Sequence, residues 1–378
     1  MPKKLLLHIG CHKTGTTAIQ RACMLNRDAL RDKGWSFALG PRNVANWGNI
    51  FGFPMTPEGV QFRITPNGYE RLGEGLDGLE GNVILSAEDL FFLEEEEIGQ
   101  LAKWLAPRFD EIEICAYLRR QDELAVSQKA QGAKTVQSAL LFGTTPGALP
   151  ELTPGVRRYL DFAGKLEAWR SAFGGPVLTV HEYNRARLSG GDIVTDFFAR
   201  LGLEPDNDLQ DVNRSLGANQ TQLLLSLRAA GLNQVAVARA RNAGWIGEDS
   251  HGGLRPSRAE AQAFLAEFAG SNRRLPDVLG HDFAFHDDMS KYPETPQDTG
   301  YAEYERDNLL ALVARLSGIA SVERALPLYN IGKSIAEIRP RMALTLMELA
   351  SELDPARQDV RRDILRLTEI VQDMDRQP

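Results

Sequence analysis

The chain is poor in cysteine and has no long apolar run, and each absence excludes a class of protein. Its 378 residues include three cysteines, Cys11, Cys23 and Cys115. An odd number without paired spacing predicts neither a disulfide framework nor a zinc site. No apolar run approaches the roughly 18 residues that cross a bilayer, and His8 ends the first apolar stretch early. We expect no integral membrane segment, no metal and a cytoplasmic location.

Positive charge is also scarce. The sequence holds 43 basic and 51 acidic residues, for a formal charge of −8. A nucleic-acid-binding protein needs a basic stripe, and this sequence has none, so we expect no nucleic-acid partner. A phosphorylated ligand must therefore be bound by a few local cations and not by the field of the whole molecule.

What the sequence does have is the ordinary composition of a soluble globular protein, 43% hydrophobic and 25% charged. Apolar runs typical of buried strands recur, each followed by a helical pattern, which predicts an α/β fold with a three-layer parallel sheet. The clearest runs are 5–9, 83–86, 112–118 and 177–181, and the first helix is expected over about 16–33. Two irregular stretches, 34–80 and 132–155, should lie near the carboxyl ends of the strands, where such sheets bind ligands.

The second half of the sequence is predominantly helical. Helices are expected over 217–230, 257–270, 301–318, 333–352 and 356–373, with Ser257 and Glu260 forming a capping box. The polar stretch 287–300 holds two prolines and predicts a linker. The domains are therefore predicted as an α/β domain 1–286, the linker 287–300 and a helical C-terminal region 301–378. The C-terminal helices either pack on the main domain or form a homodimer contact, and the sequence does not decide between these.

Chemistry-bearing residues gather first in the segment GCHKTGTT, residues 10–17, between the first strand and its helix. A glycine turn that opens a helix presents unpaired backbone amides and the positive end of the helix dipole, so it can bind phosphate or sulfate. The spacing of Gly10 and Gly15 is that of a Walker A loop, but Thr16 stands where that loop has lysine. Lys13 lies earlier, at the crown of the loop. The alternative is a turn without a ligand.

A second group of polar residues follows the third strand. Arg119 and Arg120 end the strand, and Ser127 follows eight residues after Arg119. One phosphate could be bound by Arg119 in a bidentate pair and by the Ser127 hydroxyl. The alternative is a pair of surface arginines that form salt bridges with Asp122 or Glu123.

Together the two motifs resemble the nucleotide-binding signatures of the sulfotransferases that use 3′-phosphoadenosine 5′-phosphosulfate (PAPS). In that family a Lys-x-Gly-Thr-Thr loop binds the 5′-phosphosulfate, and an arginine followed by a serine eight positions later holds the 3′-phosphate. The resemblance covers residues 1 to about 285 and implies a P-loop-like core with PAPS as donor and adenosine 3′,5′-bisphosphate as product. The donor-binding residues that it implies are His12, Lys13, Thr14, Gly15, Thr16, Thr17, Arg119 and Ser127.

The resemblance implies sulfuryl transfer, without a metal, to a hydroxyl or amine of a small-molecule or glycan acceptor, a class that includes carbohydrates and lipid-linked sugars. Lys13 would stabilise the oxygen of the leaving group. The candidate base is Glu88, followed by Asp89 and then His12. Alternatively, Glu88 and Asp89 are favourable charges at the start of the next helix. Two other functions stay open: a P-loop nucleotide kinase or NTPase, and a non-catalytic nucleotide-binding or scaffold protein.

Overall fold

The structure is a computed structural model that describes residues 2–40, 44–56, 59–175, 178–206, 216–308, 321–336 and 340–376. The chain forms two compact units, one of residues 1–243 and 248–301 and the other of residues 244–247 and 302–378. Residues 287–300, for which the sequence predicts a linker, belong to the first unit. There Tyr292 is 2% exposed, and its hydroxyl donates a hydrogen bond of 2.6 Å to Asp122. Within the described ranges no helix is both long and apolar enough to span a membrane.

The first unit is built around one sheet. Its five strands are all parallel, in the order β2-β7-β1-β8-β9. They are β1 (Lys4–His8), β2 (Trp35–Phe37), β7 (Asn82–Ser86), β8 (Glu111–Leu118) and β9 (Leu178–Glu182). The order puts β2 and β7 on one side of β1 and β8 and β9 on the other, so the carboxyl end of β1 lies at the topological switch point. The predicted α/β class with a parallel sheet is confirmed.

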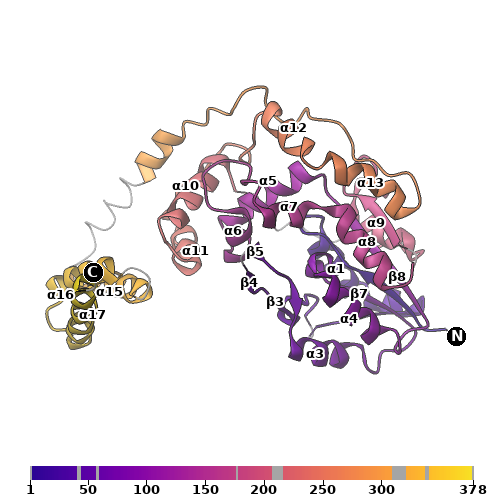
Figure 1. The fold of residues 1–378 in the computed structure, drawn as a ribbon, viewed down its shortest axis with the longest axis horizontal. Helices are drawn as coiled ribbons and strands as arrows, with labels where there is room; N and C mark the ends of the chain where they lie inside the picture. Colours follow the sequence, from indigo (N-terminus) through magenta and orange to yellow (C-terminus); the bar gives the residue numbers. More distant parts are fainter. Residues whose placement is uncertain are drawn as a thin grey trace. The chain divides into compact units, whose positions relative to one another are not determined.

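Helices cover both faces of this sheet (Figure 1). Side chains alternate along β1, so that Leu5 and Leu7 enter one core and Leu6 the other. The core of Leu6 is closed by α1 (Thr16–Leu25), α2 (Arg27–Asp32) and α9 (Ile193–Arg200). The opposite core is closed by α3 (Pro66–Leu76), α4 (Glu95–Leu105), α5 (Gln121–Gly132), α7 (Pro154–Leu160), α8 (Phe162–Ala172), α12 (Arg258–Ala266) and α13 (Ala269–Leu279).

The irregular stretch 34–80 is more structured than the sequence predicts. Residues 35–37 form β2, an edge strand that pairs with β7 from Asn82 to Ile84. This strand was missed because three residues are too few for an apolar pattern to be recognised. Beyond it lie η2 (Gly48–Ile50), the pair β3 (Phe51–Gly52) and β6 (Arg63–Ile64), and the pair β4 (Met55–Thr56) and β5 (Gly59–Val60).

Several predicted helices have different bounds. The helix expected over 16–33 is two helices, because Asn26 leaves the helical conformation and its side-chain amide donates to Ala22 O at 2.9 Å. The capping box of Ser257 and Glu260 is confirmed at the start of α12. The remaining helical elements of the unit are η3 (Glu88–Phe92), α6 (Val136–Phe142), η4 (Ser189–Gly191), α10 (Ala218–Ala229) and α11 (Gln234–Asn242).

The second unit contains α15 (Ser321–Ile335), α16 (Pro340–Leu353) and α17 (Gln358–Arg376). Its core includes Ala325, Ala343 and Met347. The prediction of one helix over 333–352 was wrong, because α15 ends at Ile335 and α16 begins with Pro340, a residue that suits the first position of a helix but not its interior. Of the helix expected over 301–318, residues 301–308 are helical and the rest lies outside the described residues. The homodimer contact stays a prediction.

Candidate functional site

The loop between β1 and α1 lies at the switch point of the sheet, and two close contacts shape it. Gly10 has a φ of 73°, and a Cβ there would lie 2.5 Å from Glu88 Cα. Gly15 has a φ of 80°, and its Cβ would lie 2.9 Å from Ile193. Only glycine combines this backbone conformation with so little room. The two glycines therefore hold the loop against η3 on one side and α9 on the other.

The backbone amides of this loop are available to a ligand. Gly15 is the N-cap of α1 and supplies no side-chain acceptor to the first turn. In the part of the chain that the structure describes, the amides from Lys13 to Thr17 have no hydrogen-bond partner. The hydroxyls of Thr14 and Thr16 point back to Cys11 O, at 2.6 and 3.5 Å. Free amides at the N-terminus of a helix bind anions well, because the helix dipole adds positive charge there.

Lys13 stands at the crown of this loop in a strained conformation. Its φ of 62° makes it the one non-glycine residue with positive φ among those described, at a cost of about 1–2 kcal/mol. The ammonium donates to Gln131 Oε1 on α5 at 2.8 Å. The pKa of Lys13 is lowered to about 8, chiefly by burial and then by the charges of Lys134 and Arg119, against the opposing effect of Glu88. Strain kept at one lysine in a loop with free backbone amides is typical of a functional position.

His12 is held on all sides. Its Nε2 bonds to Asp89 Oδ1 at 3.0 Å, its Nδ1 bonds to the hydroxyl of Tyr159, and its ring stacks on Phe92 with a centroid separation of 4.5 Å. Burial alone would lower the pKa of His12, but the hydrogen bond and charge of Asp89 outweigh it and raise this pKa. Because both ring nitrogens are occupied, His12 has no nitrogen left to take a proton from a substrate. It positions the loop.

Glu88 is the acidic group with free oxygens. It begins η3 directly after β7, and its carboxylate has no hydrogen bond or ion pair within the described ranges. Burial and then the charge of Asp89 raise the pKa of Glu88, although His12 and Lys13 oppose the change. Asp89, the second candidate base, is occupied by His12. A half-buried carboxylate with raised pKa next to a loop with free backbone amides is suited to general-base chemistry.

Arg119 brings a second cation to the same end of the sheet. Its Nη1 donates to Lys13 O at 3.4 Å and its Nε donates to Glu123 at 3.3 Å. The two motifs are therefore in contact, and the alternative salt bridge of Arg119 to Glu123 is also observed. Ser127 lies in the second turn of α5, half-buried, and its hydroxyl has no partner among the described residues.

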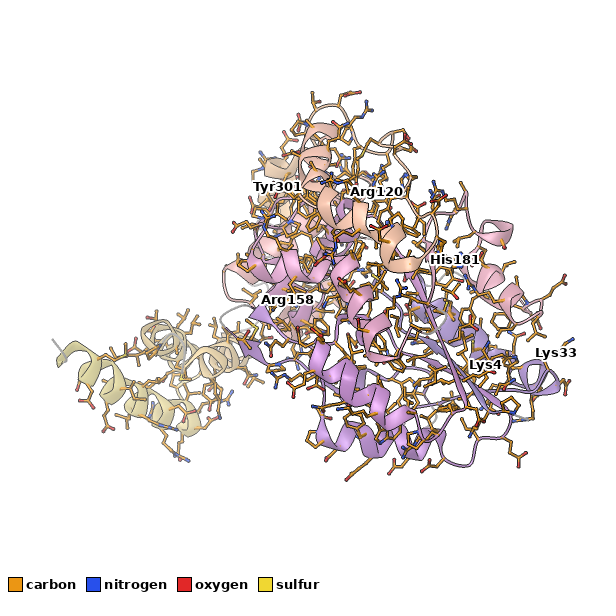
Figure 2. All side chains as sticks on the ribbon, turned by 45° about the vertical axis from the view of Figure 1, so that its right-hand side comes forward. Lys4, Lys33, Arg120, Arg158, His181 and Tyr301 are labelled. Carbon is orange, nitrogen blue, oxygen red and sulfur yellow. The ribbon has the colours of Figure 1, made fainter. Side chains whose placement is uncertain are left out.

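Arg120 has a structural role. It is 1% exposed and forms a bidentate pair with Asp122, with distances of 2.7 and 2.9 Å. Its Nη1 donates to the carbonyls of His286 and Asp288 at 2.7 and 3.0 Å. These contacts hold residues 286–288 against the start of α5. Figure 2 shows Arg120 and Lys4 at opposite ends of the sheet.

Sequence reasoning missed Gln131 and the role of Tyr159 toward His12. Both side chains reach the loop from helices on the face of the sheet opposite α1, Gln131 from α5 and Tyr159 from α7. Nothing in their local sequence marks them, because only the packing of α5 and α7 places them there. No group of three or more His, Cys, Asp or Glu side chains that could hold a metal ion occurs in the ranges that the structure covers.

Comparisons with known proteins add little to this geometry. No family model matches the chain. A protein of Archaeoglobus fulgidus described as uncharacterized is 30% identical over 122 residues, which are 32% of this chain and 30% of that protein. The chain thus matches about a third of the length of that relative. The crystal structure of a sulfotransferase from Alicyclobacillus acidocaldarius superposes with a TM-score of 0.38 and 15% identity, over 75% of this chain and 97% of the other. So low a score does not establish a shared fold.

Proposed function

We propose that this protein is a sulfotransferase that moves a sulfuryl group from PAPS to a hydroxyl or amine of an acceptor. The observation that carries the proposal is the convergence of three groups at the carboxyl ends of β1, β7 and β8. These are the amide loop with Lys13, the free carboxylate of Glu88 and the guanidinium of Arg119. Each is suited to a different part of the transfer.

The loop fits the phosphosulfate end of such a donor. Its unpartnered amides from Lys13 to Thr17 can bind several anionic oxygens, and the dipole of α1 adds to their attraction. A side chain at Gly10 would collide with Glu88 and one at Gly15 with Ile193, so either would displace the loop. Thr16, which replaces the lysine of a Walker A loop, leaves Lys13 as the cation of this loop.

Sulfuryl transfer breaks the bond between sulfur and the bridging oxygen of PAPS and leaves adenosine 3′,5′-bisphosphate. Negative charge then develops on that oxygen, and a positioned cation stabilises it. Lys13 would supply this charge, provided that its ammonium leaves Gln131. Its lowered pKa of about 8 still keeps it largely protonated at neutral pH.

Glu88 would take the proton of the acceptor. Its carboxylate has no partner among the described residues, and its pKa is raised by burial and by Asp89. A pKa closer to the operating pH makes a carboxylate a better general base. His12 and Asp89 are hydrogen-bonded to each other and would hold the loop in position beside Glu88. Arg119 and Ser127 would hold the second phosphate of the nucleotide, at the start of α5.

Transfer from labelled PAPS to a panel of sugars, amino sugars, phenols and lipid extracts, with product identified by mass spectrometry, tests this proposal. We expect a sulfated product that disappears in Lys13→Ala, while the circular dichroism of that variant stays unchanged. Near-normal turnover in Lys13→Ala contradicts the mechanism. Binding of nucleotide without turnover of any acceptor favours a non-catalytic protein instead.

A further inference from the structure

A cluster of cations that has no acidic partner among the described residues lies at the carboxyl end of α5, beside the loop of the candidate site. It consists of Lys134, which follows α5, Arg228 at the end of α10, which donates to the carbonyl of Ala133, and Arg241 at the end of α11, whose charge acts on Lys134. We call these three side chains the basic cluster. All belong to the first unit.

Hydrogen bonds fix the elements that carry the basic cluster. Arg228 Nε donates to Ala133 O at 3.3 Å, and Gln234 at the start of α11 accepts from the amide of Val136 at 3.2 Å. Figure 1 shows α10 and α11 beside α6. The link to the catalytic loop is Gln131, which accepts from Lys13 Nζ at 2.8 Å and lies one turn before Lys134. The basic cluster is thus a neighbour of Lys13.

Within the ranges that the structure describes, no acidic side chain compensates the basic cluster. Among the described residues, none of its three members forms an ion pair, and Arg228 Nη2 is buried without any hydrogen-bond partner. Burial and the charge of Arg241 lower the pKa of Lys134, and the charge of Lys134 helps to lower that of Lys13. The positive charges of Arg241, Lys134 and Lys13 therefore repel one another, although the whole chain has a formal charge of −8.

The carboxyl end of α5 does not by itself account for this cluster. A helix end attracts cations, but its dipole is equivalent to about half a negative charge, and Arg228 already caps a carbonyl there. Three half-buried cations exceed that need. An unsatisfied buried guanidinium nitrogen is costly unless a ligand satisfies it.

We propose that the acceptor carries an acidic group, a carboxylate, phosphate or sulfate ester, which the basic cluster binds while the acceptor hydroxyl faces Glu88. This inference rests on the proposed function. It names the substrate class as singly or doubly charged molecules, because three cations suit one such group and the acidity of the chain disfavours extended polyanions. Arginine is well suited to this recognition, since its guanidinium can form two parallel hydrogen bonds with a planar or tetrahedral anion.

The test uses inorganic phosphate as the probe and calorimetry as the readout. The full chain is first saturated with PAPS, so that the donor site is filled, and phosphate is then titrated. We expect one phosphate per chain, with a Kd at least tenfold higher in the double variant K134Q/R241Q. The matched control is Arg239→Gln, which removes an exposed charge from the same helix and should change this Kd by less than twofold.

The outcomes separate this inference from the proposed function. Unchanged phosphate binding in K134Q/R241Q, or its absence in the wild type, overturns the inference alone. A loss of PAPS affinity in the double variant assigns the cluster to the donor and also overturns the inference. Failure of the wild type to bind PAPS contradicts the proposed function itself. In turnover assays, acidic sugars such as glucuronate and N-acetylglucosamine 6-phosphate should be better acceptors than glucose and N-acetylglucosamine, and this advantage should be lost in the double variant.

Discussion

Replacing Gly10 by alanine tests whether the loop depends on its close approach to Glu88. The new methyl group would lie 2.5 Å from Glu88 Cα, whereas carbon atoms in contact are normally 3.5–4.0 Å apart. Because a backbone atom cannot rotate away, the loop or η3 must move by about 1 Å. Such overpacking typically costs about 1–3 kcal/mol, in addition to the cost of a positive φ.

Gly34 provides the matched control. Its φ of 78° is similar to the 73° of Gly10, but a Cβ there would meet nothing within 4 Å. Gly34→Ala should therefore cost about 1 kcal/mol, the strain of about 1–2 kcal/mol less the entropy that alanine removes from the unfolded chain. Gly10→Ala should cost about 1–3 kcal/mol more than the control.

Thermal unfolding followed by circular dichroism measures this difference. With a melting-temperature change of about 2–4 °C per kcal/mol in a large domain, the difference of about 1–3 kcal/mol means that Gly10→Ala should melt about 2–12 °C below Gly34→Ala. At a temperature where both are folded, only Gly10→Ala should lose affinity for adenosine 3′,5′-bisphosphate. Equal melting temperatures and equal affinities for the two variants would refute the reasoning about this loop.

Three further predictions concern charge. The value of kcat/KM should rise with pH through the raised pKa of Glu88 and fall above about pH 8 as Lys13 loses its proton. Glu88→Gln should remove the rising limb of this profile and lower the rate by about 10²–10⁴. A rising limb that is unchanged in this variant would show that another group titrates there. In calorimetry, Arg119→Ala should weaken the binding of adenosine 3′,5′-bisphosphate more than the binding of adenosine 5′-monophosphate. An equal loss of affinity for both would show that Arg119 does not bind the second phosphate. His8 is buried and its pKa is lowered to about 3, so the unfolded chain binds its proton first as pH falls below the ordinary value of 6.5; between these values His8 should cost the folded state about 1.4 kcal/mol per pH unit. Denaturation at pH 7, 6 and 5 should show a shallower pH slope in His8→Asn than in the wild type, and parallel slopes would contradict a neutral His8.

The parts of the fold that local pattern determines were predictable from the sequence. The long strands at β1, β7 and β8 are apolar runs, since both faces of a parallel sheet are buried, and the glycine loop of residues 10–15 marks the switch point through its composition. Edge strand β2 was not predictable, because three residues are too few to show a periodic pattern and because its pairing with β7 depends on the tertiary structure.

The candidate site divides in the same way. Lys13, Glu88 and Arg119 lie in the segments that follow β1, β7 and β8, so their positions along the chain imply that they meet at one edge of the sheet. Gln131, Tyr159 and the basic cluster are brought to the loop from helices α5, α7, α10 and α11. Their places depend on how those helices pack, which no local pattern records.

The most direct test of the central claim is a calorimetric titration of the full chain with adenosine 3′,5′-bisphosphate and, separately, with ATP and Mg²⁺. The loop without a lysine at Thr16, with Lys13 at its crown and Arg119 beside it, predicts one bisphosphate per chain, bound at least tenfold more tightly than ATP. Tighter binding of ATP with Mg²⁺ would contradict the account and indicate a nucleotide kinase or NTPase.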